Sequence, residues 1–128
     1  MTSLQLALSL LPDTFAVCRL PAEAALPAWA TAGDFYAITR TAHELSLVCA
    51  QEQVPAGVIC QPGWRCLQVA GPLDFALTGV LASLAQPLAR AGVSIFAIST
   101  FDTDYLLIQN DALDVAQTAL CSAGHALA

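Results

Sequence analysis

The chain has 128 residues, 57% of them hydrophobic and only 11% charged, and its formal net charge is −6. Its basic residues are four scattered arginines, so the clustered positive charge that nucleic acids and anionic membranes require is missing. No run reaches the roughly 20 apolar residues of a membrane-spanning helix. The apolar composition therefore predicts a packed interior and an apolar interface between copies of the chain, most simply a homodimer.

The first half of the chain predicts strands more clearly than helices. In residues 4–11 leucine alternates with Gln, Ala or Ser, the period of two that is typical of a strand with one buried face. Residues 21–32 are rich in alanine and start with Pro21, which predicts a short helix that Pro27 breaks or shortens. Further strands are predicted at residues 15–20, 35–40 and 45–50, the last two as a hairpin.

The second half predicts a longer helix. Residues 51–63 carry two prolines and two glycines and are interpreted as a connection to a strand at residues 64–70. A helix is predicted over residues 73–91, with Asp74 at its N-terminus and Gly92 after its C-terminus. Its apolar stripe is Leu77, Leu81, Leu84 and Leu88, and Pro87 is expected to kink its last turn.

Residues 92–109 predict a second hairpin, followed by a helix from Asn110 to Gly124. Between its apolar arms lies the sequence Ser99-Thr100-Phe101-Asp102-Thr103-Asp104. Hydroxyl and carboxylate side chains favour turns because they bond to nearby backbone, so a solvated turn is one interpretation. The segment is longer than a minimal hairpin turn requires, and the other interpretation is a binding edge.

The two hairpins are an internal repeat. Residues 35–48 align without a gap on residues 95–108, a shift of 60 positions. The repeat predicts an N-terminal module at residues 1–62 and a C-terminal module at residues 63–128. Both have the α+β order of a ferredoxin-like unit, with antiparallel sheets and helices on one face. The first copy lacks the closing helix. The leading strand at residues 4–11 is expected to complete one of the two sheets, either that of its own module or that of the other.

Residues 71–108, GPLDFALTGVLASLAQPLARAGVSIFAISTFDTDYLLI, resemble an ACT domain, a small regulatory module that binds amino acids. The match is to tandem ACT proteins with a STxxTDYLL hairpin, similar to the ACT pairs of aspartate kinases and of the CASTOR arginine sensor. The resemblance implies two tandem ACT modules, a ligand held at the interface between modules, no cofactor and no catalytic activity.

The resemblance also implies where the ligand binds. On the helix side the implied residues are Asp74, Phe75, Leu77, Thr78, Gly79 and Val80, and on the strand side they are Ile98, Ser99, Thr100, Phe101 and Asp104. The first copy offers Thr39, Arg40, Thr41 and Glu44 instead and departs from the pattern. One site per chain, built mainly by the second copy, is therefore expected.

Elementary chemistry supports such a site for a zwitterion. A helix N-terminus presents unpaired N–H groups to a carboxylate, and Asp104 or Asp102 accepts a charge-assisted bond from an ammonium group. Each residue alone has a simpler role, because Asp74 suits helix capping and Gly79 suits close packing of helix on sheet. Only their convergence at one place favours binding.

Other chemistry is not indicated. The two histidines, His43 and His125, lack zinc-ligand spacing, and His125 is near a terminus that is expected to fray. An odd count of five cysteines without C-x-x-C favours buried, reduced thiols, and no signal peptide is recognised, so a cytoplasmic location is expected. The alternative to a ligand sensor is an interaction module that dimerises and regulates a partner protein, such as an enzyme.

Overall fold

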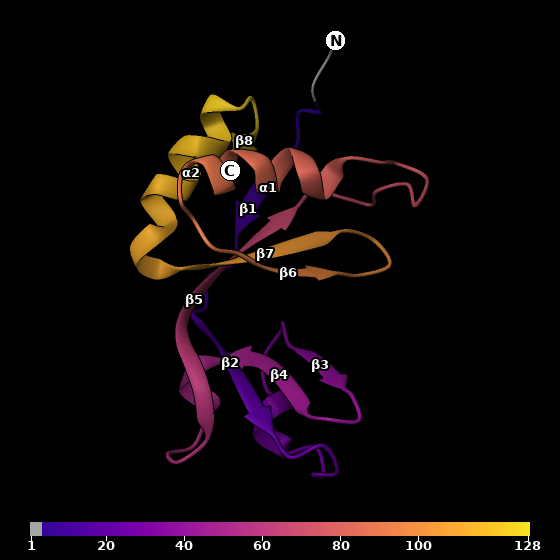
Figure 1. Ribbon diagram of the computed structural model, residues 1–128, viewed down its shortest axis with the longest axis vertical. Coiled ribbons are helices and arrows are strands. Elements are labelled where there is room, and N and C mark those ends of the chain that lie inside the picture. The colour runs from indigo at the N-terminus through magenta and orange to yellow at the C-terminus, as the bar shows by residue number, and fades with distance from the viewer. Residues whose placement is uncertain (1–3) are drawn as a thin grey trace. The chain divides into compact units, whose positions relative to one another are not determined.

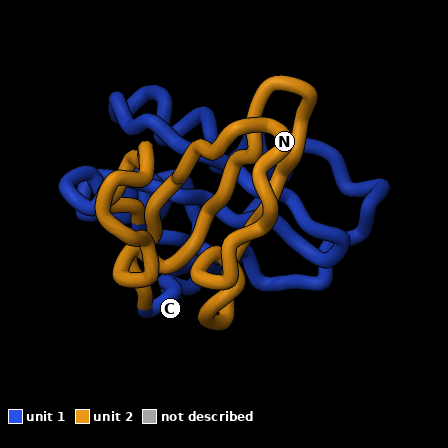
Figure 2. Tube along the Cα trace, turned by 90° about the horizontal axis from the view of Figure 1, so that it is seen from below, with its two compact units in different colours: residues 1–12, 65–128 blue, residues 13–64 orange. Residues whose placement is uncertain are grey.

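The computed structural model describes residues 4–128, which form two compact units (Figure 2). Unit 1 comprises the described residues up to Pro12 together with Arg65–Ala128, and unit 2 comprises Asp13–Trp64. The boundary at residue 64 lies close to the predicted one after residue 62, but the leading strand belongs with the second copy of the repeat. None of the helices in the described residues is long and apolar enough to span a membrane.

Unit 2 is built on an antiparallel sheet with the strand order β3–β4–β2–β5. Its elements are β2 (Phe15–Leu20), the 3-10 helix η1 (Ala28–Thr31), β3 (Ala37–Arg40), β4 (Leu45–Ala50), the 3-10 helix η2 (Gln51–Gln53) and the first part of β5 (Ile59–Val69). The predicted hairpin is confirmed as β3 and β4. Alternate side chains of β2 and β4, among them Leu45 and Leu47, bury one face of the sheet around Ala30 of η1.

The helix predicted over residues 21–32 is wrong, because only η1 forms there. Pro27 holds an extended conformation immediately before η1, with φ of −74° and ψ of 144°. The guanidinium of Arg40 donates to the carbonyl oxygens of Ala22 and Ala24. A side chain from β3 thus occupies carbonyl groups that an α-helix would have paired internally.

Strand β5 begins at Ile59, before the predicted start at Trp64, so the connection between the copies is shorter than expected. A bulge places one extra residue on β5, because the step of two positions from Phe15 to Val17 lies opposite a step of three positions from Trp64 to Gln61. Gly63 has a φ of 85° at this bulge, a conformation that costs glycine little.

From β5 onward unit 1 has the predicted βαββαβ order, to which β1 adds a leading strand, and the α+β class is confirmed. Its elements are β1 (Ala7–Leu10), the second part of β5, α1 (Val80–Arg90), β6 (Phe96–Ser99), β7 (Asp104–Gln109), the 3-10 helix η3 (Asn110–Ala112), α2 (Leu113–Ser122) and β8 (Ala126–Leu127). The leading strand β1 lies between β5 and β8, antiparallel to β5 and parallel to β8. The sheet of unit 1 is therefore mixed at this edge, not purely antiparallel as predicted.

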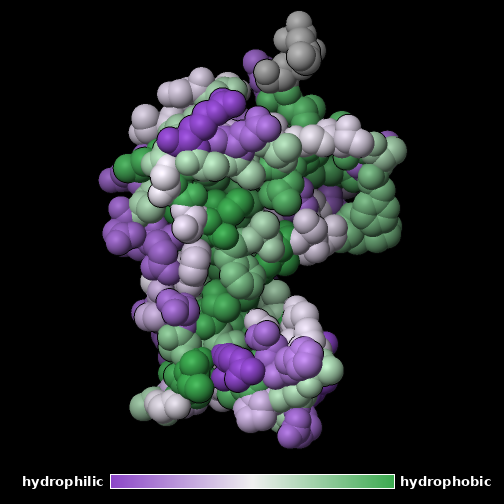
Figure 3. All heavy atoms as spheres, in the orientation of Figure 1, coloured by the Kyte–Doolittle hydropathy of each residue, from purple (hydrophilic) through white to green (hydrophobic). Residues whose placement is uncertain are grey.

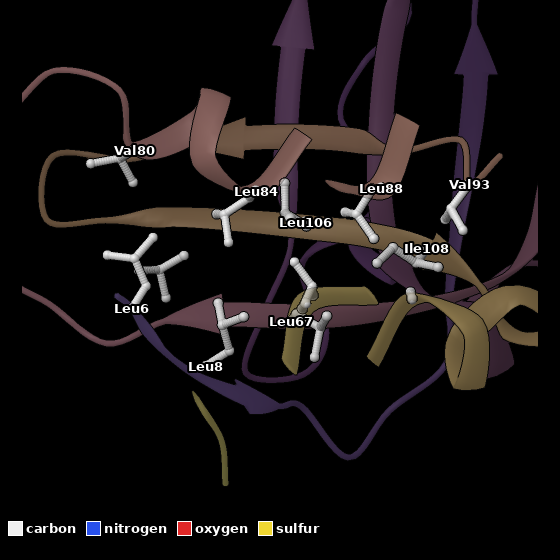
Figure 4. Packing of buried hydrophobic residues seen from close by; sticks show 12 residues of the cluster. Leu6, Leu8, Leu67, Val80, Leu84, Leu88, Val93, Leu106 and Ile108 are labelled. Atoms are coloured by element: carbon white, nitrogen blue, oxygen red, sulfur yellow. The ribbon is translucent and has the colours of Figure 1, made fainter. Parts of the chain in front are cut away.

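Both helices of unit 1 lie on the same side of its sheet (Figure 1). Leu84 and Leu88 of α1 and Leu120 of α2 are fully buried against Leu8 of β1 and Ile108 of β7. Figure 4 shows α1 side chains pointing into this cluster from above the strands. The leucine alternation of β1 is confirmed, because Leu6 and Leu8 are buried while Gln5, Ala7 and Ser9 are exposed.

Helix α1 is shorter than predicted and buries a different stripe. It begins at Val80, and its buried residues are Val80, Leu84 and Leu88, whereas Leu77 and Leu81 are 42% and 40% exposed. Gly79, with φ of 81°, precedes the helix, and this left-handed conformation prevents a regular helix from continuing through it. Asp74 therefore does not cap α1, contrary to its predicted role.

The repeat register also differs from the prediction. In one hairpin Arg40 pairs with Leu45, and in the other Ser99 pairs with Asp104, a shift of 59 positions instead of 60. Both turns close in the same way, because the N–H of Thr41 donates to Glu44 O and that of Thr100 donates to Thr103 O. Sequence identity favoured the longer shift, but the turn geometry sets the register.

Candidate ligand-binding site

Residues 73–79, in the connection between β5 and α1, lie against the turn between β6 and β7. The N–H of Leu73 donates to Asp102 O at 2.7 Å, and the Thr103 hydroxyl donates to Val69 O at 2.7 Å. Within the turn, the Thr100 N–H donates to Thr103 O at 2.8 Å. Two segments far apart in the sequence are thereby held together by hydrogen bonds to backbone carbonyls.

Gly71 permits this close approach. A Cβ atom placed on Gly71 would lie 3.0 Å from the carbonyl oxygen of Asp102 and 3.1 Å from the Cβ of Thr103. Because both neighbours belong to the hydrogen-bonded turn, a larger residue at position 71 would push the two segments apart. Thr103 itself is only 5% exposed, which is unusual for a polar turn residue.

Residues 74–77 form their own turn. The carboxylate Oδ1 of Asp74 accepts from the N–H of Ala76 at 2.8 Å, and the Asp74 carbonyl accepts from the N–H of Leu77 at 2.9 Å. This is the local bonding that aspartate favours in turns. It directs the neighbouring Phe75 toward the β6–β7 turn.

Phe75 and Phe101 meet edge to face above the two segments. Their ring centroids are 4.8 Å apart at an interplanar angle of 71°. The two residues are nevertheless 75% and 79% exposed, so the pair leaves most of its apolar surface in solvent. Figure 3 shows hydrophobic residues at the end of unit 1 where these segments lie in Figure 1.

A pocket of about 170 Å³ opens between the two segments. Its lining residues are Leu73, Asp74, Phe75, Leu77, Val80, Ser99, Thr100, Phe101, Asp102, Thr103 and Asp104. Eight of the eleven residues predicted from the sequence are among them. Pockets for drug-sized molecules hold roughly 300–1,000 Å³, so this one suits a ligand as small as an amino acid.

Three predicted residues do not line this pocket. Thr78 and Gly79 line a second pocket of about 370 Å³ beside α1, together with Arg90 and His125. Ile98 lines neither of the two. Leu73 and Thr103 line the pocket but were not predicted, and Asp102 was named only as an alternative to Asp104. Thr103 belongs to the polar sequence from which the turn was predicted.

The pocket of about 170 Å³ is lined by acidic residues and by no basic ones. Asp74, Asp102 and Asp104 contribute three carboxylates, and its lining includes no lysine, arginine or histidine. Phenyl faces attract cations, and carboxylates accept charge-assisted hydrogen bonds from them. The lining is therefore suited to a positively charged group. A metal ion is not indicated, since residues 4–128 contain no group of three or more His, Cys, Asp or Glu arranged to hold one.

The thiols of the chain play no part in this pocket. Cys18, Cys49 and Cys66 are buried and unbridged, as the sequence predicted. Burial raises the pKa of the Cys18 thiol to about 12 and that of the Cys66 thiol to about 12. Cys121, in contrast, is exposed on α2.

Comparison with family models gives two matches along the chain. An ACT domain model matches residues 59–122, half of the chain. A model of an N-terminal domain matches residues 13–57, most of unit 2.

Similar sequences and structures agree with these matches. The chain is 41% identical over 51 residues to the human protein "Cytosolic arginine sensor for mTORC1 subunit 1", covering 39% of this chain and 16% of that protein. The chain thus aligns with only about a sixth of the length of its curated relatives.

Among solved structures, an Agrobacterium tumefaciens protein is 40% identical, with a TM-score of 0.94, and the match covers 98% of this chain and 94% of that one. The regulatory subunit of aspartate kinase from Thermus thermophilus shares the fold at 14% identity, with a TM-score of 0.61 over 87% of this chain and 93% of that one.

Proposed function

The chain belongs to the ACT domain family, and from this premise we propose that it is a regulatory protein that binds an amino acid in the pocket of unit 1. The observation that carries the proposal is the meeting of residues 73–80 with the β6–β7 turn around that pocket. The protein acts by binding and carries out no catalysis. The expectation that the ligand lies between ACT modules stays a prediction.

The lining favours a ligand with a cationic side chain, and arginine is the first candidate. Three carboxylates and two phenyl rings line the pocket without a compensating cation. The human relative is described as an arginine sensor, which supports the same choice.

Each charged group of the ligand has a partner at the pocket. Asp104, at the start of β7, and Asp102 accept hydrogen bonds from a guanidinium or ammonium group. The faces of Phe75 and Phe101 cover the cation, a contact worth about 0.5–2 kcal/mol. At Val80, where α1 begins, no side chain caps the first N–H groups of the helix. These groups are available to the α-carboxylate of the bound amino acid.

A thermal-melt screen against the twenty amino acids at millimolar concentration tests the proposal. A ligand at about a hundred times its dissociation constant adds roughly 2.7 kcal/mol of stability, which moves the melting midpoint by several degrees. A selective shift with arginine supports the proposal, a selective shift with another amino acid corrects the ligand, and a flat panel refutes amino-acid binding.

One observation favours a second candidate function. Phe75, Leu77 and Phe101 of the pocket lining are large apolar residues that stay at least 40% exposed, as does Leu81 in the first turn of α1. Such a patch is typical of a protein interface, so the alternative is a module that dimerises or regulates a partner enzyme without a ligand. A flat melt panel together with a stable homodimer in light scattering would favour it. In either case we propose a cytosolic location, as the name of the human relative states for that protein.

A further inference from the structure

Unit 2 contains three cysteine side chains that meet on one face of its sheet. Cys18 on β2 directly faces Cys60 on β5 in the strand register. Cys49 lies on β4, the other neighbour of β2, and all three belong to the same apolar cluster. Cys49 faces Ala16, two residues before Cys18 on β2, so it lies diagonally across from Cys18.

The three thiols differ in their access to solvent. Cys18 and Cys49 are 1% and 0% exposed, whereas Cys60 is only partly buried. Burial raises the pKa of Cys18 to about 12 and also raises the pKa of Cys49, which keeps both thiols protonated and weakly nucleophilic at neutral pH. A reagent in solution therefore meets Cys60 first.

We propose that Cys60 is a modification site that reacts with a low-molecular-weight disulfide and passes the disulfide bond on to Cys18. In the first step Cys60 loses its proton, and its thiolate attacks the reagent R–S–S–R. A Cys60–S–S–R mixed disulfide forms, and one RS⁻ leaves and takes up the proton that Cys60 lost. In the second step Cys18 gives up its proton as its sulfur attacks the Cys60 sulfur; the Cys18–Cys60 disulfide forms, and the second RS⁻ leaves and takes up that proton as RSH. The fixed position of Cys18 directly opposite Cys60 compensates for its low thiolate fraction. Two protein thiols are oxidised and one reagent disulfide is reduced to two thiols.

The strand order selects Cys18 as the partner. Residues directly opposite each other on antiparallel strands have Cα atoms about 4.5–5.5 Å apart, within the roughly 4.4–6.8 Å that disulfides span. Cys49 is a less suitable partner for Cys60, because β2 lies between β4 and β5 in the sheet. The disulfide would join β2 to the first part of β5 inside unit 2.

The test is peptide mapping of the full chain after incubation with glutathione disulfide at pH 8. A Cys121→Ser background removes the exposed thiol of α2, which would react independently. Joint digestion with trypsin and a glutamate-specific protease separates Cys18 (residues 1–19), Cys49 (residues 45–52) and Cys60 (residues 53–65) into different peptides. Free thiols are blocked with iodoacetamide before digestion.

The expected product links residues 1–19 to residues 53–65, and the intact mass falls by two hydrogen atoms. Cys18→Ser should stop the reaction at a glutathione adduct on Cys60, whereas Cys60→Ser should leave Cys18 and Cys49 reduced. Cys66→Ser, at a buried thiol of unit 1, is the matched control and should not change the map. A link to residues 45–52, or an unmodified Cys60 in a chain that is folded by circular dichroism, would overturn the proposal.

Discussion

The Nε2 of His125 lies 3.0 Å from the carbonyl oxygen of Ser83, the acceptor that Pro87 leaves without a helical donor. In a regular helix the N–H of residue 87 would bond to this carbonyl, but proline has no N–H. On the other side of the ring, Nδ1 accepts from the N–H of Leu6 at 3.1 Å. His125 thus joins Leu6, the residue before β1, to α1. At 4% exposure it lies in the interior, contrary to the predicted frayed terminus.

Replacing this histidine should cost substantial stability. His125→Ala leaves the Leu6 N–H and the Ser83 carbonyl unpaired, and we expect a loss of roughly 2–4 kcal/mol in the free energy of unfolding. Urea denaturation of the variant measures this loss.

Pro87→Ala provides the control, because residue 87 then has an N–H for Ser83. The loss caused by His125→Ala should be smaller in the Pro87→Ala chain by about 1 kcal/mol. Additive losses in the double-mutant cycle would show that His125 does not replace the missing helical donor.

The buried stripe of α1 predicts a contrast between two neighbouring leucines. Leu84 is fully buried, so Leu84→Ala should cost about 2–5 kcal/mol, whereas Leu81→Ala should cost less than about 1 kcal/mol. Chemical denaturation of both variants measures the difference. Equal losses of unfolding free energy in the two variants would contradict this burial pattern and support the stripe predicted from the sequence, in which both leucines face the core.

The errors of the sequence prediction share a physical cause. Local patterns identified β1, both hairpins and α2, because their periodicity and turn residues agree with the tertiary structure. The start of α1 was misplaced because the leucine spacing continues through Leu77, while the left-handed backbone of Gly79 interrupts the helix. The role of Arg40 and the position of β1 between β5 and β8 depend on contacts between distant residues, which no local pattern contains.

The pocket was predictable to a similar extent. The polar residues of the β6–β7 turn indicated one side of the pocket, and the residues before α1 indicated the other side. Thr103 was missed because its hydroxyl bonds to Val69, a partner 34 positions away.

Alkaline pH should destabilise the fold through its buried thiols. Burial raises the pKa of Cys66 from its ordinary 9.0 to about 12, so the unfolded chain releases this proton first as the pH rises. The stabilisation is fully present below about pH 9 and is lost between pH 9 and 12, at up to about 1.4 kcal/mol per pH unit for one thiol.

The comparison of Cys66→Ser with the unmodified chain isolates this contribution, since both chains keep the same tyrosines and Cys18. Stability measured by urea denaturation at several pH values should fall less steeply in the variant. Identical slopes would mean that Cys66 ionises alike in the folded and unfolded chains.

Calorimetric titration of arginine into the unmodified chain and into Asp104→Asn tests the central claim most directly. Glu44→Gln, at a carboxylate in the other hairpin turn, is the matched control. We expect saturable binding to the unmodified chain and to Glu44→Gln, and binding about 10–150-fold weaker to Asp104→Asn, because a charge-assisted hydrogen bond worth about 1.5–3 kcal/mol is lost. Arginine binding of equal strength to all three chains would contradict the assignment of the ligand to the pocket between residues 73–80 and the β6–β7 turn.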